Sequence, residues 1–104
     1  MNFDLKETAD AMQLAFKGAV GEHWKDASGL VGQMLKGYER RMLLLAKAVE
    51  AGEITLEEVP AHLDDQRLIW EAQMEAIKTL SKAIAQKAVN AALDVLYTAL
   101  KNIR

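Results

Sequence analysis

The sequence predicts an all-α protein, a long antiparallel helical hairpin that is bundled by oligomerisation. Three observations support this. About half of the residues are hydrophobic and only 6% are aromatic, with the helix formers Ala, Leu and Met prominent. Apolar residues recur every three or four positions through the first half of the chain, which is the spacing of one helix face. They are Leu5, Ala9, Met12, Phe16, Val20, Trp24, Ala27, Val31, Met34, Tyr38, Met42, Leu45 and Val49. A similar spacing resumes after one well-defined turn.

The first helix is expected over about 4–51. Asn2 or Asp4 can cap its first free amide groups, and Gly52 is suited to end it. A helix of this length cannot bury its apolar stripe against itself. It therefore needs a partner, which is either the second half of the chain or another copy.

Glycines inside this first helix leave two interpretations open. They are Gly18, Gly21, Gly29, Gly32 and Gly37. In one interpretation the helix is split near Gly18–Gly32. In the other it stays continuous or kinked, and the glycines allow another backbone to approach closely. Because the apolar spacing keeps its phase across every glycine, we favour the continuous or kinked helix, although each glycine costs about 1 kcal/mol relative to alanine.

The turn is expected over 52–60. Thr55 can act as an N-cap, with Glu58 three residues later, which is the pattern of a capping box. Pro60 cannot lie deep inside a helix, because its ring would clash with the carbonyl group four residues earlier. A new helix therefore starts at Pro60 or at the Asp64–Asp65 pair.

The second helix is expected over about 61–102 in a single 1–104 domain. Large apolar residues recur there at intervals of seven, beginning with Leu63, Trp70, Ile77 and Ile84. Beyond residue 83, apolar residues cover more than half of the helix circumference. One neighbouring helix covers a stripe of only about 100°, so this segment predicts contacts on at least two sides and hence an oligomer.

The core and the interface of such a hairpin are largely one surface, for which we expect nine residues. They are Phe16, Trp24, Tyr38, Trp70, Ile77, Ile84, Val95, Leu96 and Leu100. Aromatic side chains such as the first four of these dominate the binding hot spots of interfaces.

Charge alternates along the chain. Residues 23–49 carry a net charge of +3, and residues 53–75 carry seven acidic residues against Arg67 alone. An antiparallel hairpin opposes these two segments, with Arg40 and Arg41 close to Asp64 and Asp65. Exposed pairs contribute only a few tenths of a kcal/mol each, so charge selects the register without holding the helices together.

No residue pattern indicates catalysis, a cofactor or a metal. The two histidines, His23 and His62, lie far apart in the sequence, and Pro60 interrupts the helix between Glu58 and His62. The chain has no cysteine, no glycine-rich phosphate loop and no nucleophile with an adjacent base. Its net charge of −2 argues against a nucleic-acid-binding protein.

We therefore expect a non-enzymatic structural or assembly subunit that self-associates or packs in a larger particle, such as a phage virion or a secretion apparatus. One alternative is an adaptor or inhibitor that docks on a larger protein through the acidic 53–75 segment. A second is a lipid-surface-binding amphipathic protein, although a membrane role is disfavoured by the acidic N-terminal polar face. With no signal peptide or apolar span in the sequence, we expect a location in the cytoplasm or within an assembled particle.

Overall fold

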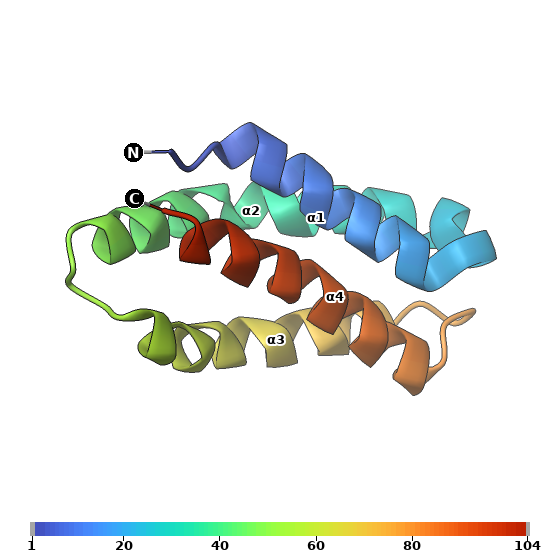
Figure 1. The fold of residues 1–104 in the computed structure, drawn as a ribbon. Helices are drawn as coiled ribbons and strands as arrows, with labels where there is room; N and C mark the ends of the chain where they lie inside the picture. Colours follow the sequence, from blue (N-terminus) through green and yellow to red (C-terminus); the bar gives the residue numbers. More distant parts are fainter. Residues whose placement is uncertain (1, 104) are drawn as a thin grey trace.

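The computed structural model describes residues 2–103, which form four α-helices and two short 3₁₀ turns (Figure 1). In chain order the elements are α1 (Leu5–Val20), η1 (Gly21–His23), α2 (Trp24–Glu50), η2 (Leu56–Glu58), α3 (Val59–Glu75) and α4 (Lys82–Lys101). The predicted all-α class is confirmed. The long two-helix hairpin is not what forms, because each predicted helix is divided into two.

The first predicted helix is split at Gly21, so of the two interpretations the split near Gly18–Gly32 is confirmed and the favoured continuous or kinked helix over 4–51 was wrong. Gly21 has φ +57°, in the left-handed region that glycine adopts without a steric penalty, and its N–H donates to the carbonyl of Lys17. The 3₁₀ turn η1 then reverses the chain into α2. Because this turn lasts only three residues, the apolar spacing continues almost undisturbed from one helix to the next, which hid the break in the sequence.

The remaining glycines of this region do not mark close helix crossings within the chain. At Gly18, Gly29, Gly32 and Gly37, no heavy atom other than those of the adjacent residues and the nearby backbone of the same helix lies within 4 Å of where a Cβ would stand. The interpretation of these glycines as contact points for another backbone is therefore wrong for the single chain.

The second predicted helix, over 61–102, is also divided, between Glu75 and Lys82. Ser81 has extended backbone angles and its Oγ accepts a hydrogen bond from the N–H of Ile84 at 3.1 Å, so it starts α4 as an N-cap. Thr79 donates to the carboxylate of Asp26 at 3.0 Å, which ties this turn to the beginning of α2. The break lets α4 run back between the other helices instead of continuing away from them.

Helix α4 lies between α1 and α3, and it packs most closely against α1 (Figure 1). This placement buries most of the apolar surface that the sequence shows beyond residue 83. The residues that become buried within one chain are Ala85, Ala88, Val89, Ala92, Leu93, Leu96 and Leu100. The expectation that this segment needs another copy to cover it is therefore wrong, since α1 and α3 cover it together.

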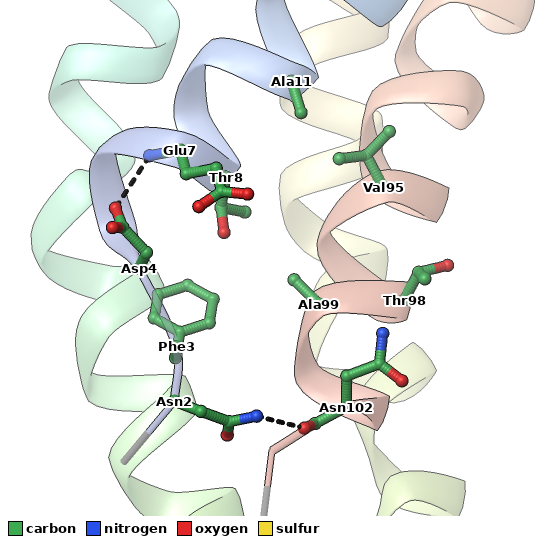
Figure 2. Close-up of a pocket in the computed structure, with 10 residues that line it drawn as sticks. All are labelled: Asn2, Phe3, Asp4, Glu7, Thr8, Ala11, Val95, Thr98, Ala99 and Asn102. Atoms are coloured by element: carbon green, nitrogen blue, oxygen red, sulfur yellow. Dashed lines mark hydrogen bonds between the residues drawn. The ribbon is translucent and has the colours of Figure 1, made fainter.

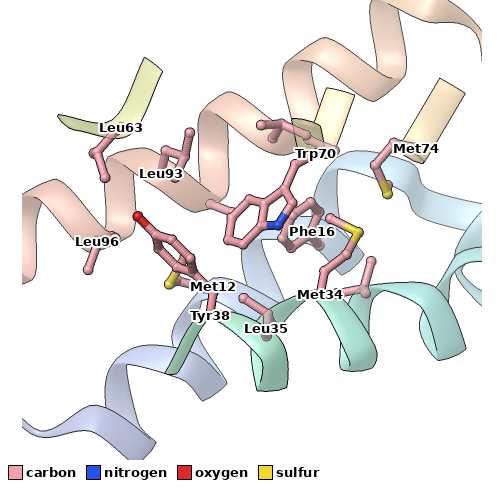
Figure 3. Close-up of a cluster of buried hydrophobic side chains, with 14 of the residues drawn as sticks. Met12, Phe16, Met34, Leu35, Tyr38, Leu63, Trp70, Met74, Leu93 and Leu96 are labelled. Carbon is pink, nitrogen blue, oxygen red and sulfur yellow. The ribbon is translucent and has the colours of Figure 1, made fainter. Parts of the chain in front are cut away.

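Trp70 of α3 lies at the centre of the core and is 1% exposed (Figure 3). The rings of Phe16 and Tyr38 meet its indole edge to face, with centroid distances of 5.8 and 5.2 Å. Such pairs add about 0.5–1.5 kcal/mol beyond the burial of their area. Through these three rings, α1, α2 and α3 share one core.

The connection between α2 and α3 follows the prediction. The capping box forms: the N–H and the hydroxyl of Thr55 both donate to Oε1 of Glu58, each at 3.0 Å. These hydrogen bonds lower the pKa of the Glu58 carboxyl group. Pro60 takes the second position of α3, where no intrahelical N–H is required. Helix α3 therefore begins at Val59, one residue before the first of the two predicted starts.

Candidate interaction surface

Helix α3 is apolar on two opposite sides. Its buried side carries Val59, Leu63, Trp70 and Met74, which face the core. Its solvent side carries a second run of apolar residues, which we call the outward stripe: Ala61, Leu68, Ile69 and Ala72, followed by Ala76 at the C-cap, all exposed. An exposed helix of a small protein normally confines its apolar residues to one face.

The outward stripe has a bulky centre and small ends. Leu68 is 64% exposed and Ile69 is 53% exposed, and both are among the few large apolar side chains left open to solvent in the described chain. Alanines on either side of them allow another helix to approach. A stripe with spacings of three and four residues is the pattern by which one helix packs on another.

Acidic side chains surround the outward stripe. Asp64, Asp65 and Glu75 are exposed on α3. The guanidinium of Arg67 contacts Asp64 of the same helix at 3.1 Å. The surface around Leu68 and Ile69 therefore carries a negative charge, which favours a partner with basic side chains.

The solvent side of α2 carries the opposite charge. Its basic line consists of Lys25, Lys36, Arg40 and Lys47, all exposed and one to three helical turns apart on the same side of the helix. Leu44 lies beside Arg40 and is 57% exposed. The predicted proximity of Arg40 and Arg41 to Asp64 and Asp65 does not produce an ion pair in the described residues, since Asp64 pairs with Arg67 instead.

A shallow cleft of about 290 Å³ separates the second half of α2 from the turn and the start of α3. It is lined by Tyr38, Arg41, Leu44, Leu45, Ala48, Ile54 and His62. The Tyr38 hydroxyl is buried and has no hydrogen-bond partner among the described residues. Burial raises the pKa of this phenol, and the nearby Arg41 opposes the shift. The lining residues include no carboxylate that could act with His62.

A second cleft, of about 280 Å³, lies where the two ends of the described chain meet (Figure 2). Its polar groups serve the fold. Asp4 caps α1 by accepting from the N–H of Glu7 at 2.9 Å, and the side chain of Asn2 donates to the carbonyl of Asn102 at 2.7 Å. Beside this cleft, the hydrogen bond from Asn2 to Asn102 therefore ties the segment before α1 to the end of α4.

The nine residues predicted for the core or interface are distributed between two environments. Those that the single chain buries are Phe16, Tyr38, Trp70, Leu96 and Leu100. Those that are half-buried at the edge of the core are Trp24, Ile77, Ile84 and Val95. None of the nine belongs to the outward stripe.

Sequence reasoning missed the outward stripe, although its signal is present. The heptad spacing of Leu63, Trp70 and Ile77 marks the buried side of the helix, whereas Leu68 and Ala72 lie in the opposite phase. Two large residues outside the main stripe of a helix are the signal that could have revealed a second contact face.

Nothing in the described residues indicates a metal or a membrane-spanning element. No group of three or more histidine or acidic side chains is close enough to hold a metal ion within residues 2–103. No helix in that range has the length and apolar content needed to cross a bilayer. His23 lies 3.8 Å from Glu22, its neighbour in the chain. Comparisons with known proteins add no assignment, since no protein family, curated protein or solved structure matches the chain.

Proposed function

We propose that this chain is a non-enzymatic assembly subunit that packs the outward stripe of α3 against a helix of another copy. The observation that supports it is the pair of adjacent exposed residues, Leu68 and Ile69, on a helix whose other face already fills the core. Apolar side chains placed together on a helix surface, within reach of small residues, are typical of contact surfaces.

Helix α3, and not α4, offers the exposed apolar surface for this contact. The apolar residues of α4 are enclosed by α1 and α3, so they stabilise the individual subunit. Association through α3 can then occur between subunits that are already folded, without rearrangement of the core.

The mass of the full chain in solution tests this proposal. We expect light scattering and native mass spectrometry to give at least twice the monomer mass of 11.5 kDa. Leu68→Asp together with Ile69→Asp should reduce the mass to that of a monomer while the helical circular dichroism spectrum is retained. Both side chains are more than half exposed, so the substitutions remove little from the core.

Leu14 provides the matched control. It is 66% exposed on α1, and Asp10, Gln13 and Lys17 lie near it. Leu14→Asp places one aspartate, in place of two, at a similarly exposed leucine on a different helix and should leave the mass unchanged. A wild-type chain that stays monomeric at every concentration would contradict the proposal.

An adaptor that docks on a different protein is the second candidate. The specific observation that favours it is the acidity of the same surface, where Asp64, Asp65 and Glu75 surround Leu68. A monomeric wild-type chain that binds a basic helical peptide, and loses this binding on Leu68→Asp, would support the adaptor over the assembly subunit.

A further inference from the structure

The outward faces of α2 and α3 are complementary in charge. The basic line of α2 consists of four cations, with the exposed Leu44 beside them, whereas the outward stripe of α3 has acidic side chains around Leu68 and Ile69. Opposite charges around exposed apolar side chains favour binding between two such surfaces and disfavour the binding of each surface to itself.

The two faces cannot meet within one copy. Each lies on the solvent side of its own helix, opposite the side that packs into the core. We infer that the basic line of one copy binds the outward stripe of the next copy. This inference rests on the proposed function and specifies which surface of the neighbouring copy is bound.

An antiparallel register of the two helices matches both charge and shape. It opposes Lys25 to Glu75 and Lys36 to the Asp64–Asp65 pair, and it places Leu68 over Gly32. Gly32 is exposed, and apart from the adjacent residues and the nearby backbone of α2 no heavy atom lies within 4 Å of the position its Cβ would occupy, so the surface there has room for a leucine from a neighbour. A parallel arrangement that pairs Lys36 with Asp65 sets Arg40 against the apolar Ile69 instead.

The use of two different faces determines the kind of assembly. Two copies joined by a single α2–α3 contact leave one α2 face and one α3 face free, so this contact continues into a ring or an open filament. A two-fold dimer formed by α3 on α3 would instead bring together the Asp65 and Glu75 carboxylates of both copies. Charge repulsion disfavours that dimer.

Two charge-reversed full-length chains test the inference. The first carries Lys25→Glu and Lys36→Glu on α2. The second carries Asp65→Lys and Glu75→Lys on α3, which leaves the Asp64–Arg67 ion pair in place. All four side chains are exposed, so we expect circular dichroism to show an unchanged fold for both chains. Lys17→Glu with Lys87→Glu, on α1 and α4, is the control with the same change in charge as the first chain.

We expect wild type and control to form species larger than a dimer, and each charge-reversed chain alone to associate at least about tenfold more weakly. An equimolar mixture of the two reversed chains should restore the assembly, because each α2 then faces an oppositely charged α3. Added salt should weaken the wild-type assembly.

Three outcomes separate the possibilities. If the mixture stays monomeric while wild type assembles, the pairing of α2 with α3 is wrong. If the α2-reversed chain associates as strongly as wild type but the Leu68→Asp, Ile69→Asp chain does not, α3 binds elsewhere and only the further inference fails. If wild type itself is monomeric, the proposed function fails as well.

Discussion

Leucine-to-alanine substitutions at residues 96 and 68 should have very different effects on stability, although the chemical change is the same. Leu96 on α4 is fully buried, whereas Leu68 on α3 is 64% exposed. Leu96→Ala removes about three methylene equivalents at about 0.8 kcal/mol each, and the cavity that remains adds to this cost. We expect a loss of about 3 kcal/mol in the free energy of unfolding, within the usual range for buried leucines.

Leu68→Ala should change the free energy of unfolding of the single chain by less than about 0.5 kcal/mol. A chain of this size has a total stability of about 5–15 kcal/mol, so Leu96→Ala remains folded and measurable. Urea unfolding followed by far-ultraviolet circular dichroism, at low and at high protein concentration, gives both values.

Whether the stability loss of Leu96→Ala depends on protein concentration distinguishes burial of Leu96 within one chain from burial between subunits. Burial of Leu96 within one chain predicts a loss that is the same at both concentrations, because folding of a single chain is unimolecular. A loss below about 1 kcal/mol, or a loss that appears only at high concentration, would show that the apolar side of α4 is covered by another subunit.

Further predictions concern four single sites. Gly21→Ala should destabilise the chain by about 1–2 kcal/mol, because Gly21 has a positive φ. Gly32→Ala should instead stabilise the isolated fold by up to about 1 kcal/mol, because Gly32 lies inside a helix with open space at its Cβ position. Chemical denaturation compares the two variants. Tyr38→Phe should keep or raise stability, because the buried hydroxyl has no partner. Wild-type stability should also fall relative to Tyr38→Phe as the pH rises above 10.0, the ordinary pKa of a tyrosine, because the unfolded phenol ionises there while the buried one stays protonated; unfolding across alkaline pH measures this difference. Ser81→Ala should lower the free energy of unfolding by about 1 kcal/mol, because it removes the N-cap of α4. Thermal unfolding measures this loss, and an unchanged midpoint would show that the cap does not stabilise the fold.

The local features of the fold could be predicted from the sequence because they depend on neighbours in the chain. The apolar stripe that contains Phe16 and Tyr38 predicts helices, since a 3.6-residue period places such residues on one side. The capping box of Thr55 and Glu58 predicts the turn, since both groups lie within four residues. The all-α fold class and the position of the central turn were therefore determined by the sequence.

Only the tertiary structure decided where the long helices break and which apolar surface is left exposed. The breaks at Gly21 and before Ser81 are stabilised by the return of α4 between α1 and α3, a contact between segments far apart in the sequence. That return buries Leu96 and leaves Leu68 exposed, although both are leucines in apolar helical segments. Periodicity shows which residues share a face, but burial depends on what packs against that face, and this is decided by the whole chain.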